Sequence, residues 1–114
     1  MELRILRLEN SQGQGVYACA YGTACAHAAN SPDPSPREDG IPAIRAREYC
    51  GFIDETQMRN WFSNRKMDMR LYEQGIEVST YLVDEQYVRK GGHQIVFERD
   101  EATMVDRQPL HCYA

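Results

Sequence analysis

The order of apolar and polar positions predicts β-strands at the start and in the second half of the chain. Glu2 to Glu9 mixes leucine and isoleucine with two arginines and has no helix-capping residue. Asn10 to Gly15 follows, where two glycines and short polar side chains permit a tight turn. Ile76 to Val83 is rich in β-branched residues and comes directly after Gly75, which is well placed to end a helix. These segments predict a first strand, a turn and a later strand.

The middle of the chain has helical spacing. Asp54 followed by Gln57 is a capping-box pattern and predicts a helix start. We expect the helix to break near Ser63-Asn64 and restart. Its apolar positions recur at helical intervals, with Arg65 inside the stripe: Met58, Trp61, Phe62, Met69 and Tyr72. We expect Met58, Trp61 and Phe62 to pack in the core rather than to form an exposed anchor for a partner.

Two shorter β-segments follow the later strand. Tyr87 to Lys90 and His93 to Glu98 are separated by Gly91-Gly92, and Asp84 to Gln86 provides a turn before them, which predicts an antiparallel meander. Asp100 could cap a short final helix through Val105 that ends before Pro109.

These elements predict an α+β fold in a single domain of residues 1–114. We expect an antiparallel sheet of about four strands with one main helical segment packed on it. Residues 18–46 contain four prolines and no strong periodicity, which predicts a long, partly ordered Pro-rich surface loop.

Composition narrows the class of partner. The formal charge of −4 and pI near 5.3 oppose a general affinity for nucleic acid, so we expect no direct nucleic-acid binding and a basic protein partner instead. No stretch reaches the roughly 20 apolar residues of a membrane span, and the N-terminus lacks the apolar run of a signal peptide. We therefore expect a cytosolic protein with no membrane partner. Composition does not indicate the oligomeric state.

The cysteines and histidines do not have the spacing of a metal site. Structural zinc sites use close pairs such as C-x₂₋₄-C, whereas here the candidates are more widely spaced or scattered. The four cysteines could form two disulfides, but a cytosolic chain is expected to keep them reduced. We predict no metal, no cofactor and no catalytic residue from this set: Cys19, Cys25, His27, Cys50, His111 and Cys112.

The candidate partner-binding residues are acidic side chains with neighbouring tyrosines. Tyrosine beside carboxylates is a good surface for Arg or Lys, through hydrogen bonds, charge pairing and cation–π contact. We expect the tyrosines on the outer face of the meander and the remaining acidic residues in the Pro-rich loop. The predicted contact set is Tyr81, Asp84, Glu85, Tyr87, Asp33, Glu38 and Asp39.

Three short motifs resemble a group of small phage and prophage proteins. They are Gln14-Gly15-x-Tyr17 after the first strand, Cys50-Gly51-Phe52 before a helix ending in Trp61-Phe62, and Gln94-Ile95-Val96-Phe97 near the end. The resemblance covers most of the chain except the Pro-rich loop, and it implies a phage accessory protein acting in the host cytoplasm. Small acidic phage proteins of this size include anti-CRISPR inhibitors. The resemblance therefore implies an inhibitor that binds a host CRISPR helicase-nuclease or surveillance complex stoichiometrically.

Two other classes remain open at this point. Arg4 or Arg7, Tyr17 and the late strand with Glu98 as the nearby carboxylate loosely resemble small ADP-ribosyltransferases, which would modify a host protein. A virion assembly protein would instead self-associate through an exposed apolar patch. We interpret the protein as a binding protein rather than an enzyme.

Overall fold

The computed structural model describes residues 1–16, 39–41 and 44–113, so most of the predicted Pro-rich loop lies outside the described residues. The described elements form six strands, two short helices and four 3₁₀ turns. The strands are β1 (Glu2–Glu9), β2 (Glu48–Gly51), β3 (Glu77–Asp84), β4 (Val88–Lys90), β5 (Ile95–Glu98) and β6 (Thr103–Gln108). The helices are α3 (Glu55–Trp61) and α4 (Asp68–Glu73), and the 3₁₀ turns are Arg65–Met67, Glu85–Tyr87, Arg99–Glu101 and Leu110–Cys112.

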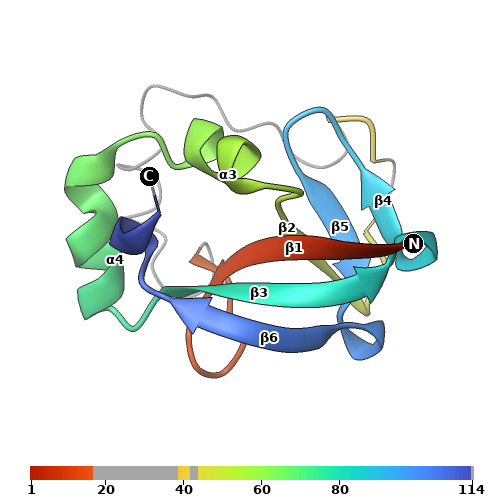
Figure 1. Ribbon diagram of the computed structural model, residues 1–114. Coiled ribbons are helices and arrows are strands. Elements are labelled where there is room, and N and C mark those ends of the chain that lie inside the picture. Colours follow the sequence, from red (N-terminus) through yellow and green to blue (C-terminus); the bar gives the residue numbers. More distant parts are fainter. Residues whose placement is uncertain (17–38, 42–43, 114) are drawn as a thin grey trace.

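The strands form two antiparallel sheets of three, in the orders β1-β3-β6 and β2-β5-β4 (Figure 1). A single antiparallel bridge between Leu6 and Phe52 joins β1 to the residue after β2. The two sheets therefore meet at β1 and β2 as one curled surface. The expectation of an antiparallel α+β fold is confirmed, and the strands divide into two sheets rather than one.

Two apolar clusters hold these layers together. One lies between the sheets and centres on Ile5, Tyr81 and Phe97. The other lies between the opposite face of β1-β3 and the helices, and includes Leu8, Val78 and the predicted helical stripe residues Met58, Trp61 and Phe62. Met69 and Tyr72, farther along that stripe, remain exposed.

Local sequence signals set the helix boundaries as expected. The side chain of Asp54 accepts a hydrogen bond from the Gln57 amide at 2.8 Å, which confirms the predicted cap. The helix ends at Trp61, a 3₁₀ turn begins at Arg65, and Gly75 has a φ of 81°, the left-handed conformation that ends α4. None of the helices in the described part of the chain is long and apolar enough to cross a membrane.

Two expectations about the second half are wrong, and one strand in the first half is not predicted by the sequence. Residues after Asp100 form a 3₁₀ turn and strand β6 rather than a final helix, because Thr103 to Gln108 pair with the free edge of β3. β3 does not continue a meander into β4, since β3 pairs with β1 and β6 while β4 pairs with β5. β2 was not expected as a strand, and only its pairing with β5 reveals it.

Candidate functional site

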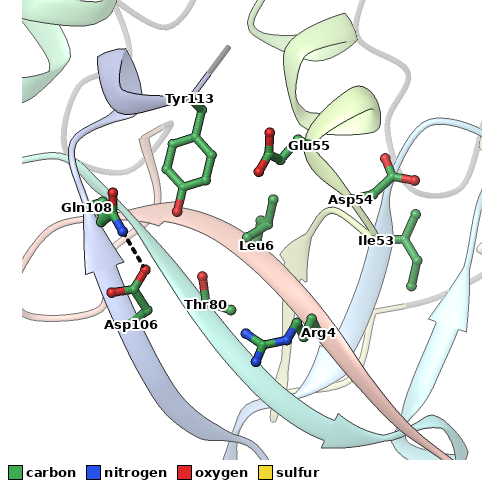
Figure 2. A pocket seen from close by; sticks show the side chains of 9 residues that line it. All are labelled: Arg4, Leu6, Ile53, Asp54, Glu55, Thr80, Asp106, Gln108 and Tyr113. Atoms are coloured by element: carbon green, nitrogen blue, oxygen red, sulfur yellow. Dashed lines mark hydrogen bonds between the residues drawn. The ribbon is translucent and has the colours of Figure 1, made fainter.

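An open pocket of about 440 Å³ lies on the face of the β1-β3-β6 sheet, beside the start of α3 and the C-terminal segment (Figure 2). Leu6 and Thr80 are buried in its floor, on β1 and β3. The other residues that line it are Arg4, Ile53, Asp54, Glu55, Asp106, Gln108 and Tyr113.

Strand register explains why these residues converge. Leu6 pairs with Thr80, and Thr80 pairs with Asp106, so all three point to the same side of the sheet. That side is covered by the helices at the Leu8 and Val78 end. The sheet surface is open farther along, where the pocket lies.

Three carboxylates surround the pocket, on Asp54, Glu55 and Asp106. None of them forms an ion pair with a residue in the described ranges, and neither does Arg4. Asp54 caps α3, and Asp106 accepts a hydrogen bond from the Gln108 side chain at 3.0 Å. The pocket therefore carries more negative than positive charge.

The pKa of the Tyr113 phenol reflects the negative charge of the pocket. Burial raises the pKa of its phenol, and the carboxylates of Asp106 and Glu55 raise that pKa further, against a lowering by the hydrogen bond with Thr80. Carboxylates beside an aromatic ring are suited to bind a cation.

Negative charge continues along the sheet beyond the pocket. Glu2 lies two residues before Arg4 on β1, so it is on the same side of the sheet as Arg4, which lines the pocket. Asp84 pairs with Glu2 and lies two residues after Leu82, the partner of Arg4, so Asp84 is on this side too. We call these residues the acidic face: Glu2, Asp54, Glu55, Asp84 and Asp106.

The predicted residues at the end of β3 lie next to the N-terminus. Asp84 and Glu85 are each about half exposed and lie 3.7 and 3.6 Å from the Met1 ammonium group. Tyr87 is only partly buried and packs against the cluster between the sheets. The structure thus brings Asp84, Glu85 and Tyr87 together, and places Asp84 on the acidic face.

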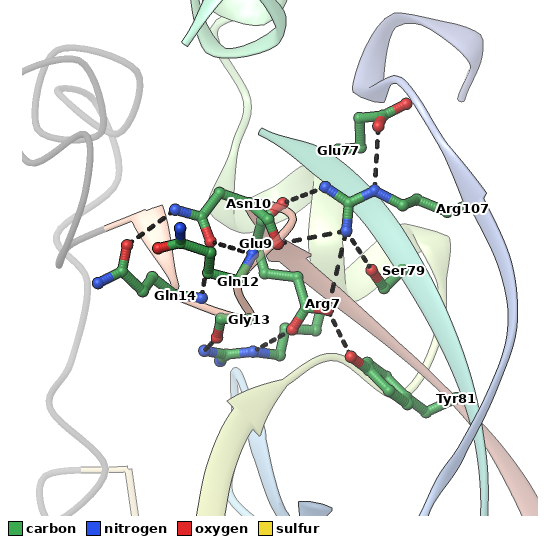
Figure 3. A network of polar contacts seen from close by, with 10 residues as sticks. All are labelled: Arg7, Glu9, Asn10, Gln12, Gly13, Gln14, Glu77, Ser79, Tyr81 and Arg107. Atoms are coloured by element: carbon green, nitrogen blue, oxygen red, sulfur yellow. Dashed lines mark hydrogen bonds and ion pairs between the residues drawn. The ribbon is translucent and has the colours of Figure 1, made fainter. Parts of the chain in front are cut away.

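Tyr81 lies elsewhere. It is fully buried between the two sheets, which corrects the expectation that it lies on an outer face. Its hydroxyl donates a hydrogen bond to the buried carboxylate of Glu9 (Figure 3). Burial raises the pKa of Tyr81, and so does Glu9. Alternation along β3 puts Tyr81 on the side opposite Thr80, and the second sheet covers that side.

Glu9 is the centre of a polar network that closes the end of the first sheet (Figure 3). Arg7 donates to Glu9 at 2.9 Å, and Arg107 donates to the Glu9 carbonyl at 3.2 Å and to Glu77 at 3.0 Å. These charged side chains bind one another and the backbone within the protein, so the network positions the strands and does not offer its charged groups to a partner.

Asp39 is also structural. Its carboxylate accepts hydrogen bonds from the backbone amides of His93 and Gln94 at 2.8 and 3.0 Å, and it lies 2.7 Å from the His93 ring. A Cβ on Gly91 would lie 2.5 Å from Asp39 Oδ2, so glycine permits this approach. Asp39 fixes the turn between β4 and β5. Asp33 and Glu38, the other predicted loop residues, lie outside the described residues.

Low pH should lower the stability of the fold, because it protonates the carboxylates of Asp39 and Glu48. Burial opposes ionisation of Asp39, but hydrogen bonds from His93 and Gln94 outweigh it and lower its pKa. Hydrogen bonds from Arg89 lower the pKa of Glu48 against the effect of burial. Because both pKa values are lower in the folded state, their stabilisation is complete at neutral pH and disappears as pH falls below about 4.

Urea unfolding at pH 7 and pH 3 measures this effect. We expect Asp39→Asn to lose part of the pH dependence, while Asp100→Asn, which changes an exposed carboxylate, keeps it. An equal fall in stability for wild type and Asp39→Asn would contradict the assignment.

The metal-ligand candidates are only partly placed. Cys50 is partly buried, and burial raises the pKa of its thiol, whereas Cys112 is exposed. Within the described ranges no three His, Cys, Asp or Glu side chains are grouped to hold a metal. Cys19, Cys25 and His27 fall outside those ranges. Glu98, the carboxylate of the enzyme alternative, ends β5 opposite Glu48 and does not line the pocket.

Sequence reasoning missed the pocket. The sequence predicts only a helix cap at Asp54, and it predicts no role for Glu55 or Asp106. Their convergence depends on the β3–β6 pairing, which no local pattern signals.

A family model described as Bacteriophage T4 Y00F protein matches residues 1–111. No curated protein and no solved structure matches the chain.

Proposed function

The chain belongs to the Bacteriophage T4 Y00F protein family, and from this premise we propose that it is a phage accessory protein that binds a host protein stoichiometrically. The observation that carries this proposal is the acidic face, whose pocket carboxylates have no ion-pair partner among the described residues. Unpaired carboxylates on strands and at a helix start form a fixed negative surface that a basic protein surface complements.

The proposed target is a CRISPR-type nuclease or surveillance complex in the host cytoplasm. Such machines hold nucleic acid on surfaces rich in Lys and Arg, because phosphates must be neutralised. A protein with an acidic face is steered to such a surface and blocks it by occupying it. The total charge of −4 is modest, which favours binding through shape and a local patch over imitation of a whole nucleic-acid strand.

Affinity capture tests the proposal. Tagged protein is incubated with lysate of a host that carries active antiviral systems, and retained proteins are identified by mass spectrometry and quantified against the bait. Recovery of a CRISPR nuclease or surveillance subunit in a fixed ratio supports the proposed function. Recovery of no stable partner contradicts it.

Charge reversal at the end of β3 should weaken the complex. Asp84→Lys with Glu85→Lys places two positive charges where a basic partner would approach, and we expect a loss of about 1 kcal/mol or more and slower association. The matched control is Asp100→Lys with Glu101→Lys, an exposed pair on another turn with the same change in net charge. Surface plasmon resonance with the captured partner compares the two variants. Equal association rates for both would remove Asp84 and Glu85 from the interface.

A further inference from the structure

The helical segment around α4 exposes basic side chains beside aromatic ones. The 3₁₀ turn Arg65–Met67 leads directly into α4. Met69 and Tyr72 are three residues apart on α4 and share one face of that helix, and Arg70 follows Met69 directly. Arg65 and Lys66 come from the 3₁₀ turn just before α4. Arg65, Lys66 and Arg70 are all exposed.

A second aromatic ring comes from the C-terminal turn. α4 and this turn lie side by side at one end of the molecule (Figure 1). The Tyr72 and His111 rings meet edge to face, with centroids 5.6 Å apart. Tyr72 is 44% exposed and Met69 48%, so the rings and the thioether are accessible rather than packed in the core.

The positive charge of this surface is not neutralised locally. Arg65, Lys66 and Arg70 form no ion pair with a residue in the described part of the chain. Asp68 lies within the same segment, but it is buried and paired with Arg59 at 2.8 Å. Within residues 65–73, Glu73 is the one exposed acidic residue. This segment therefore has a net positive surface on an acidic protein.

We propose that this surface, the α4 face, binds single-stranded nucleic acid; the α4 face consists of Arg65, Lys66, Met69, Arg70, Tyr72 and His111. Lys and Arg neutralise backbone phosphates, and unpaired bases stack on exposed aromatic rings. An acidic peptide would need only the cations. The exposed rings beside these cations are suited to the stacking of bases, which favours nucleic acid over an acidic peptide. The proposal goes beyond the proposed function and does not rest on it.

The overall charge bears on the strength of this binding. A formal charge of −4 disfavours a general affinity for nucleic acid, so we expect the affinity to come from these three cations and the two rings. We therefore expect a short footprint and moderate affinity.

Fluorescence anisotropy of a labelled 15-nucleotide dT strand tests the proposal with the intact protein. Three phosphate contacts predict a slope of about −2 for log K against log salt concentration. Replacing Arg65, Lys66 and Arg70 with glutamine should lower affinity about tenfold or more and flatten that slope. Tyr72→Ala should lower affinity about fivefold or more through lost stacking, whereas Tyr72→Phe keeps wild-type affinity.

A matched triple variant shows whether binding belongs to this surface. Arg45→Gln, Arg47→Gln and Lys90→Gln remove the same charge from other exposed positions, and we expect affinity to stay close to wild type. The proposal is overturned by the absence of binding at about 100 μM protein in low salt, by an equal loss in both triple variants, or by equal competition from a deca-glutamate peptide. Circular dichroism confirms that each variant is folded.

Discussion

Asp68→Ala should destabilise the fold by about 3–5 kcal/mol, because it leaves a buried arginine without its counter-charge. Arg59 donates to both carboxylate oxygens of Asp68, at 3.1 and 2.8 Å. Both side chains are less than a tenth exposed, so bulk water compensates poorly for the lost partner. Arg59 already has one buried nitrogen, Nε, without a hydrogen-bond partner among the described residues.

The effect of Asp68→Ala should extend to the pocket. Arg59 also donates to the carbonyl oxygens of Leu110 and Tyr113, each at 2.9 Å, and so attaches the C-terminal segment to the helices. Tyr113 lines the pocket, so a displaced Arg59 would loosen that side of it.

Urea unfolding followed by circular dichroism measures this loss. Asp100→Ala is the control, because Asp100 is two-thirds exposed and its ion pair with Arg47 spans 3.9 Å, and we expect a change within about 0.5 kcal/mol. A loss below about 1 kcal/mol for Asp68→Ala would show that the pair contributes little to the fold.

Phe97→Ala should cost about 3–5 kcal/mol by opening a cavity between the two sheets. Phe97 lies on β5, is fully buried, and contacts the Tyr81 ring with centroids 5.4 Å apart. Among the described residues the Leu6–Phe52 bridge is the one β-bridge between the two sheets, so side-chain packing in this cluster contributes much of what holds them together.

Thermal unfolding measures the effect of Phe97→Ala. For a chain of this size the expected loss lowers the melting temperature by roughly 10 °C or more. Met104→Ala is the control, since Met104 is 41% exposed and its truncation removes little packing. A melting temperature within about 3 °C of wild type would contradict the assigned core.

Local signals in the sequence predicted the elements whose boundaries depend on near neighbours. β1, the turn at Gly13, the Asp54 cap, the end at Gly75 and β3 all follow from residue types within a few positions. β2 and β6 depend on partners far along the chain, because β2 pairs with β5 and β6 with β3. The sequence after Asp100 also fits a capped helix, so only tertiary pairing decides its structure.

The candidate site follows the same rule. Asp84, Glu85 and Tyr87 are adjacent in the sequence and lie together in the structure. Tyr81 was misplaced because alternation shows which residues share a side, but not which side the second sheet covers. The pocket carboxylates come from α3 and β6, and no spacing in the sequence indicates their proximity.

The most direct test of the acidic face as a binding surface is parallel affinity capture with two baits, wild type and a Glu55→Lys, Asp106→Lys variant. Both residues are exposed and line the pocket, so the substitutions change its charge without disturbing the core. We predict that wild type retains one host protein in a fixed ratio and that the folded variant retains at least tenfold less, which corresponds to about 1.4 kcal/mol or more. Equal retention by the two baits would contradict the account.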